Sequence, residues 1–253
     1  MTGARSGPRR RAGRFRPRRG NRGGVRAAWQ RDYPVGVAAH KRNAASPGCP
    51  CVGNVGAVGD RQVLRPGVDG VDPYRLLTAL VVPRPIAWVA STDADGKGNL
   101  APHSFFTVAS VRPPIIAFTS IGPKDTLRNI QATGEFTVSL VSDDAIDAAN
   151  ATSAPVPPDV DEAAAFGVAM RPSTLVAPPH VASSPAAFEC RLRHTVGFEE
   201  STMVFGDVVA FSIDDEVLVD GHPEFGRLRP VSRLGRDEWG LPPEVVTRAR
   251  PRG

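Results

Sequence analysis

The chain has 253 residues, enough for one domain of ordinary size and an extension, since single domains commonly run about 100 to 200 residues. Residues 1–60 hold 13 Lys and Arg residues against two acidic ones, so this segment carries +11, and the net charge of +5 leaves −6 for the rest. The basic character thus belongs to an N-terminal segment, and no apolar run of the sequence is long enough to span a bilayer.

That segment, residues 1–65, combines clusters of arginine with many Gly and Pro and few aliphatic residues. Such a composition cannot bury enough apolar surface to offset its conformational entropy, so we predict a disordered basic tail. A basic tail can contact nucleic acid by neutralising phosphates, weakly and without sequence preference, or it can be simply a solvated extension; it lacks the interleaved aromatic residues or zinc-finger pattern of a specific binder. No apolar stretch follows the arginines as a secretory or twin-arginine signal requires, so we expect a cytoplasmic location and no membrane contact.

After the tail we predict one folded domain over residues 66–243. Residues 74–77 favour a short helical turn that leads into the first strand. The apolar run at residues 86–92 is followed by Asp-Ala-Asp-Gly and Lys-Gly, which is turn chemistry, so the chain should fold back at residues 93–98 as a β-hairpin.

Two more β-type runs, residues 105–110 and 115–119, are separated by the turn-forming Arg112-Pro113-Pro114. Lys124-Asp125-Thr126 then opens a segment whose apolar spacing suits the first turns of a helix, with Asp125 or Thr126 near its N-cap. A helix N-terminus offers free amides and a favourable dipole, and Lys124 adds a positive charge. This point of the chain therefore suits a phosphorylated ligand.

Further along, the sequence again favours strands. The β-type runs are residues 134–141, 187–196, 202–213 and 217–219. Residues 143–151 are Ala-rich and predicted helical, and residues 155–186 form a proline-rich excursion around a helical patch at 161–166. Many short strands with few helices favour a mainly β barrel with short peripheral helices over a doubly wound sheet. The Arg-rich residues 244–253 are expected to be frayed.

Metal and disulfide chemistry are not indicated. Cys49 and Cys51 lie in the tail without metal-site spacing, and Cys190 stands alone on a β-run, where a lone cysteine is normally a buried thiol. None of the five histidines pairs with another at ligand spacing. The hairpin also contains a Gly-x-Gly-x-x-Ala string, but Pro102 and β-type residues follow it where a dinucleotide-binding fingerprint needs a helix.

Several motif blocks occur in order along the chain: Pro-Arg-Pro-Ile-Ala-Trp-Val from residue 83, Asn-Leu-Ala-Pro-x-Ser-Phe-Phe from residue 99, a Pro-Pro strand, and Lys-Asp-Thr-x-x-x-Asn-Ile from residue 124. Over about residues 72–239 they resemble the flavin reductase-like proteins with an FMN-binding split-barrel fold. The resemblance implies an NAD(P)H:FMN oxidoreductase that works as a homodimer, with FMN in the groove between subunits. It also implies a flavin-dependent monooxygenase as a partner that could receive reduced flavin.

The resemblance implies that residues of these blocks contact the flavin. They are Ser91, Thr92, Asn99, Ala101, Ser104 and Phe105, with Lys124 and Thr126 near the phosphate. Composition alone favours Ser91, Thr92 and Asn99 as caps of a hairpin, and the order of the motifs reverses that preference. His103 lies in the same block, where it either faces the flavin or serves a surface or dimer contact. No catalytic residue is assigned, because hydride transfer needs no protein acid.

One departure from the family pattern keeps a second function open. Where relatives often place a histidine, just before an Ile-Asp-Asp turn, this chain has Ser212. Such a histidine is commonly suspected of helping at the nicotinamide side, so Ser212 favours an FMN-binding or electron-carrier protein with negligible pyridine-nucleotide turnover. A third reading is a nucleic-acid-associated protein that acts through its basic tail.

Overall fold

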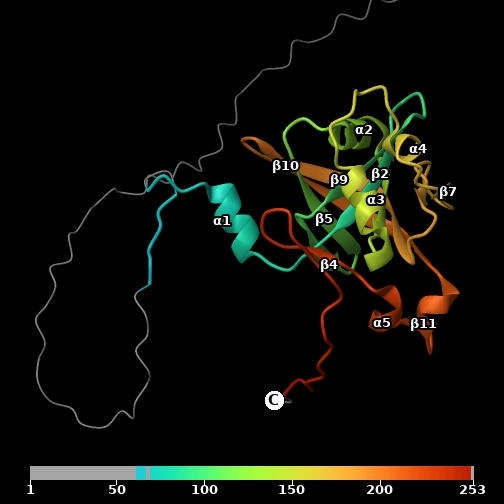
Figure 1. Ribbon diagram of the computed structural model, residues 1–253. Helices are drawn as coiled ribbons and strands as arrows, with labels where there is room; N and C mark the ends of the chain where they lie inside the picture. Colours follow the sequence, from blue (N-terminus) through green and yellow to red (C-terminus); the bar gives the residue numbers. More distant parts are fainter. Residues whose placement is uncertain (1–60, 67–68, 252–253) are drawn as a thin grey trace, which may run out of the picture. The chain divides into compact units, whose positions relative to one another are not determined.

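The structure is a computed structural model that describes residues 61–66 and 69–251 (Figure 1). Most of the predicted basic tail therefore lies outside the described residues. The last part of that tail, residues 61–65, is exposed and belongs to no helix or strand.

One antiparallel sheet forms the body of the domain (Figure 1). It has seven strands in the order β3-β2-β6-β9-β10-β5-β4. Its strands are β2 (Ala87–Thr92), β3 (Gly98–His103), β4 (Phe106–Val111), β5 (Pro114–Ile121), β6 (Glu135–Leu140), β9 (Ala186–Phe198) and β10 (Ser201–Ile213). Strand β3, at one end of this order, also contacts β5 near the other end, so the sheet curls into a barrel. The predicted hairpin at residues 93–98 is confirmed, since Thr92 pairs with Gly98 in the β2–β3 ladder.

Short helices and small ladders surround the sheet. The helices are α1 (Pro73–Leu80), α2 (Asp125–Thr133), α3 (Ile146–Ala151), α4 (Glu162–Ala165) and α5 (Phe225–Leu228), with 3-10 turns η1 (Asp143–Ala145) and η2 (Asp215–Val217). The small ladders join β1 (Arg84–Pro85) to β13 (Ser232–Arg233) and β14 (Trp239–Gly240), β7 (Met170–Arg171) to β8 (His180–Val181), and β11 (Leu218–Val219) to β12 (His222–Pro223). Residues 241–251 have no regular structure, and no helix among the described residues could cross a membrane.

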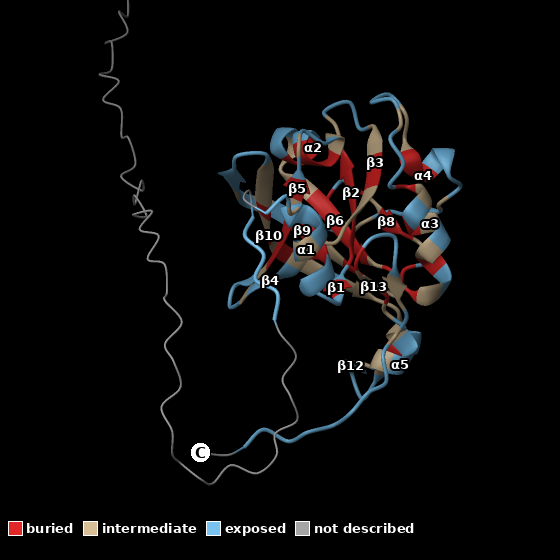
Figure 2. Cartoon of the chain, turned by 60° about the vertical axis from the view of Figure 1, so that its left-hand side comes forward, coloured by how far each residue is buried: buried red, intermediate tan, exposed pale blue. Residues whose placement is uncertain are grey.

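Strand β2 is buried along its whole length because both of its faces are covered (Figure 2). Ala87 and Val89 belong to an apolar cluster shared with β5, β6, β10 and α2, whereas Trp88 belongs to a second cluster that includes residues of α3 and α4. The Trp88 Nε1 donates a hydrogen bond of 2.9 Å to the Thr152 Oγ1, which satisfies the one polar group of the indole. The uninterrupted apolar run of this strand follows from burial on both faces.

Helix α2 packs on β2 and β3, which places its first turn beside the end of the β2–β3 hairpin. Leu127 and Ile130 are buried in the first apolar cluster, as their spacing of three residues indicates. The N-cap is Lys124, so Asp125 and Thr126 occupy the first helical positions. Lysine has no side-chain acceptor and makes no capping hydrogen bond, so the first backbone amides of α2 have no partner from their N-cap residue.

Candidate functional site

A cleft of about 720 Å³ opens between β3, the corner from β3 to β4, the end of β5 and the first turn of α2. Its volume is in the range of small-molecule and cofactor sites. Six of the eight predicted flavin contacts line this cleft: Asn99, Ala101, Ser104, Phe105, Lys124 and Thr126. The structure therefore brings together residues from two separate motif blocks of the sequence.

The other two predicted contacts, Ser91 and Thr92, are not among the lining residues of the cleft within the described part of the chain. Both are buried on β2, which is the neighbour of β3 in the sheet. The Ser91 hydroxyl lies 3.5 Å from the Asn99 Oδ1 and accepts a hydrogen bond of 3.4 Å from the Asn129 Nδ2. Ser91 thus contacts Asn99 from the neighbouring strand. Direct contact of Ser91 or Thr92 with a ligand stays a prediction.

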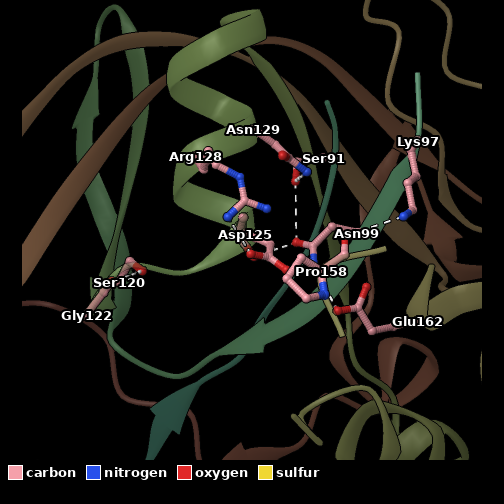
Figure 3. A network of polar contacts seen from close by, with 11 residues as sticks. Ser91, Lys97, Asn99, Ser120, Gly122, Asp125, Arg128, Asn129, Pro158 and Glu162 are labelled. Carbon is pink, nitrogen blue, oxygen red and sulfur yellow. Dashed lines mark hydrogen bonds and ion pairs between the residues drawn. The ribbon is translucent and has the colours of Figure 1, made fainter. Parts of the chain in front are cut away.

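Asn99 is the centre of a buried polar network (Figure 3). Its Oδ1 accepts a hydrogen bond of 2.7 Å from the Thr126 Oγ1, and its Nδ2 donates one of 2.9 Å to the Glu162 Oε1. The side chains of this network, together with Ser91 and Asn129, belong to residues that are at most 7% exposed. Because buried polar groups are costly unless paired, the network holds each of these side chains in one arrangement.

Glu162 is a residue that the sequence analysis did not assign to the site. It lies in α4, within the proline-rich excursion, and it lines the cleft although it belongs to no motif block. Burial raises the pKa of its carboxyl group, and hydrogen bonds from the Leu100 amide and the Asn99 side chain partly oppose this rise. Glu162 is one of three acidic residues in a short stretch with Asp159 and Asp161, so no local signal distinguishes it.

The end of the cleft at α2 combines positive charge with backbone amides that have no capping partner among the described residues. Lys124 is exposed and lines the cleft at the N-cap of this nine-residue helix. The Asp125 carboxylate, which would oppose an anion here, forms an ion pair of 2.8 Å with Arg128 one turn further along. This end of the cleft is therefore suited to an anionic group such as a phosphate.

His103 forms part of the cleft wall, with its ring centroid 4.7 Å from that of Phe118. Its Nε2 is buried and has no hydrogen-bond partner among the described residues. Burial and, to a smaller extent, the positive charge of Lys124 lower the pKa of His103 to about 4. The imidazole is therefore neutral near pH 7, and of the two predicted roles the structure favours the cleft over a surface position.

Arg84 is a second residue whose role the sequence did not reveal. Its guanidinium is buried and donates hydrogen bonds to the backbone carbonyls of Thr78 and, at 2.8 Å, Leu234. On the cleft side its Nε donates to the Ser104 Oγ at 3.4 Å, and its Cζ lies 5.9 Å from the centre of the Phe105 ring. Arg84 therefore connects α1 and the segment between β13 and β14 to the rim of the cleft. The sequence feature that could have drawn attention to Arg84 is its position between two prolines at the start of an apolar run.

Among the described residues, no group of three or more His, Cys, Asp or Glu side chains is placed to hold a metal ion. Cys190 is buried in the first apolar cluster, as predicted. Burial raises the pKa of its thiol well above the usual range, which removes it as a nucleophile near pH 7. The chemistry of the cleft thus rests on hydrogen bonds, charge and shape.

Comparison with known proteins assigns this fold and cleft to a family. Residues 79–229, more than half of the chain, match the family model described as flavin reductase like domain. An uncharacterized protein of Halalkalibacterium halodurans is 37% identical over 190 residues, which cover 70% of this chain and 90% of that protein. The chain therefore belongs to the flavin reductase-like family.

Solved structures share the architecture. Nitrilotriacetate monooxygenase component B from Bacillus cereus superposes with a TM-score of 0.69 at 27% identity, over 74% of this chain and 100% of that chain. A protein assigned as a flavin reductase with a split barrel domain, from Shewanella frigidimarina NCIMB 400, superposes with a TM-score of 0.67 at 21% identity, over 72% and 96%. The second likeness concerns the fold alone, and it confirms the predicted split β-barrel with short peripheral helices.

Proposed function

We propose that this chain is an FMN-binding oxidoreductase of the flavin reductase type, which transfers hydride from NAD(P)H to FMN. The observation that carries the proposal is the convergence of six predicted flavin contacts on one cleft that ends at Lys124 and the free amides of α2. Membership of the flavin reductase-like family supports it.

The residues of the cleft fit FMN chemically. A flavin phosphate needs cationic and amide donors, which Lys124 and the start of α2 supply. A flat ring with carbonyls and ring nitrogens needs a few polar partners on an otherwise apolar wall, and Asn99 and Ser104 lie beside Phe105 and Ala101 in the lining. We infer that Lys124 and Thr126 are at the phosphate end and the β3 residues at the ring end.

FMN, when bound, supplies the electron chemistry, and the protein contributes binding, orientation and exclusion of water. Asn99 and Thr126 hold their positions through the buried network, and Arg84 holds Ser104 and Phe105 at the rim. His103 is neutral near pH 7 and adds no charge to the wall of the cleft. No described residue needs to donate a proton for hydride transfer itself.

Anaerobic reduction tests the reaction directly. FMN-loaded protein mixed with NADH or NADPH should lose its visible flavin absorbance, whereas free FMN at the same concentration should lose it far more slowly. The faster nucleotide of the two identifies the donor. If neither nucleotide bleaches the bound flavin, the chain is not a reductase.

We further propose a twofold homodimer with the flavin groove between subunits. Large apolar side chains are exposed on α1 and on β4, which is an edge strand: Leu80 is 75% exposed, Val108 65% and Val111 77%. Exposed apolar residues beside an unpaired strand edge are typical of interaction surfaces, and Tyr74 of α1 already lines the cleft. Light scattering of the FMN-loaded protein should give the mass of a dimer, and the mass of a monomer would contradict the proposal.

A partner monooxygenase is the proposed receiver of reduced flavin, because a solved structure 27% identical to this chain is a monooxygenase component. Ser212 favours the second candidate, an FMN-binding or electron-carrier protein without significant nucleotide turnover. The bleaching experiment separates the two. The cytoplasmic location, and weak non-specific contact of the tail with nucleic acid, remain predictions from the sequence.

A further inference from the structure

The orientation of the Asn99 side chain is determined by chemistry as well as by geometry. An ionised carboxylate can only accept hydrogen bonds, so the atom of Asn99 that faces the Glu162 Oε1 must be the amide nitrogen. The carbonyl oxygen then faces the Thr126 hydroxyl, which donates to it at 2.7 Å. The Thr126 hydroxyl could serve as donor or acceptor, so it does not determine which way the Asn99 amide is turned. Glu162 determines it.

Glu162 itself is held firmly against β3. Its second carboxylate oxygen accepts a hydrogen bond of 3.0 Å from the Leu100 amide, so both oxygens are used by neighbouring residues of one strand. Helix α4 approaches β3 so closely that a Cβ at Gly98 would collide with the carboxylate of Asp161, the N-cap of α4. The missing side chain at Gly98 therefore leaves room for the N-cap of α4 beside β3.

We propose that Glu162 is a positioning residue that fixes the direction of hydrogen bonding in the cleft through Asn99. This inference rests on the proposed function, because it specifies how Asn99 and Thr126 meet a flavin. With the amide so fixed, the hydroxyl hydrogen of Thr126 is used within the protein and is withheld from the ligand. Asn99 has a second N–H, which makes no hydrogen bond among the described residues, so it offers a ligand a donor.

Exchange of Glu162 for glutamine should reverse this direction. The glutamine oxygen can still accept from the Leu100 amide, and its NH₂ then faces Asn99, whose amide must turn to present its oxygen. Turned in this way, Asn99 offers an acceptor where the flavin carbonyls and the hydrogen-free ring nitrogens N1 and N5 of oxidised FMN need a donor. Charge alone predicts the opposite result, because loss of a carboxylate near an anionic ligand should tighten binding.

The test compares E162Q, N99D and the double variant E162Q/N99D in the full chain, with D159N as the matched control. Asp159 is exposed and lies in the same excursion, so D159N removes one negative charge without touching the network. The two readouts are FMN affinity, from quenching of flavin fluorescence, and the melting temperature of the FMN-free protein.

We expect E162Q to weaken FMN binding by roughly tenfold or more and to lower the melting temperature by only about 2 to 4 °C, since most hydrogen bonds re-form after the turn. N99D should melt lower than E162Q, because two buried carboxylates would face each other. The double variant should recover the melting temperature, because the NH₂ group of the introduced glutamine can donate to the introduced aspartate. It should not recover the affinity, since an aspartate has no N–H. D159N should match the unchanged protein in both readouts.

FMN binding by E162Q as tight as that of the unchanged protein would overturn the positioning role, even if E162Q melted lower. A double variant no more stable than N99D would show that Glu162 does not set the direction of the Asn99 amide, and would also overturn it. If the unchanged protein takes up no FMN, the proposed function fails. The order of melting temperatures then still shows whether Glu162 sets the direction of the Asn99 amide.

Discussion

At the scale of single residues, Lys124 allows the contact with the flavin phosphate to be tested separately from the contacts with the ring. It lies at the start of α2, where an anionic group is favoured, whereas the residues assigned to the ring belong to β3 and the corner that follows it. We predict that Lys124→Ala weakens FMN binding by roughly tenfold to hundredfold, as expected for loss of a charge-assisted contact of about 1.5 to 3 kcal/mol, and leaves riboflavin binding nearly unchanged. Parallel titrations with the two flavins measure the difference.

The matched control is Lys97→Ala, which removes a lysine that contacts the Pro158 carbonyl at 3.4 Å but does not line the cleft. It should bind both flavins normally. Equal losses of FMN and riboflavin binding in Lys124→Ala would place this lysine elsewhere than at the phosphate.

His103 gives the folded state a dependence on pH. Its pKa is about 4 in the folded chain, against 6.5 as the ordinary value, so between these values the unfolded chain binds a proton that the folded chain does not. The free energy of unfolding therefore falls as the pH falls from about 6.5 to about 4, by on the order of 2 to 3 kcal/mol from this residue. Urea titrations at several pH values in this window measure the slope.

His103→Gln should make that slope shallower, because glutamine does not titrate. Part of the slope should remain, since burial also lowers the pKa of His180. His222→Gln, at an exposed position of β12, should keep the full slope. An unchanged slope in His103→Gln would mean that the histidine is protonated in the folded protein near pH 6.

At the scale of the elements, the β9–β10 hairpin contains two glycines with opposite requirements. In β10, a Cβ at Gly206 would collide with the ring of Phe136, whereas a Cβ at Gly197 in β9 would meet open space. We predict that Gly206→Ala lowers the free energy of unfolding by about 1 to 3 kcal/mol, as overpacking of a core does. Gly197→Ala should change it by less than about 0.5 kcal/mol.

Urea unfolding of the two variants provides the measurement, and the comparison is matched because both replace a strand glycine by the same residue. Equal stability of the two variants would show that β6 can move away from β10 at Phe136, and hence that the first apolar cluster is less tightly packed than its burial indicates.

Elements whose pattern is local were predictable from the sequence. The β2–β3 hairpin has its turn residues in the loop, and the ladder of β9 with β10 follows two long β-type runs. The predicted helix at residues 143–151 is present in two parts, the 3-10 turn η1 and α3. The pairing of β7 with β8 was not predicted, because each has only two residues and depends on the fold of the excursion.

The candidate site was predictable only where residues of a motif form it. Asn99, Ser104 and Lys124 come from motif blocks, and the structure places them in the cleft. Glu162 reaches Asn99 across 63 residues of sequence, and nothing in the sequence of α4 indicates a partner so distant. Contacts of this kind are determined by the path of the chain in space, which local patterns do not contain.

For the molecule as a whole, we predict that deletion of residues 1–65 leaves FMN binding, dimerisation and any reductase rate essentially unchanged. The described residues build both apolar clusters and the cleft from position 74 onward. The deletion also turns the net charge from positive to negative, which should abolish weak, salt-sensitive adhesion to DNA. Flavin titration, light scattering and DNA binding at two salt concentrations test these outcomes.

An insoluble or flavin-free truncated protein would show that the domain requires the tail. Sequence-selective DNA binding by the full chain that persists at high salt would instead support the nucleic-acid-associated reading, since a purely electrostatic contact weakens steeply with salt.

The hydrogen bond from Arg84 to the Leu234 carbonyl spans 150 residues of sequence, and the same guanidinium supports Ser104 at the rim of the cleft. A ribosome adds roughly 5 to 20 residues per second, so Arg84 is made about 8 to 30 seconds before the carbonyl that it binds. During that interval β2 and β3 can already pair, because both lie close together in the chain. The rim of the cleft is therefore completed last, when the nascent chain has been extended almost to its end.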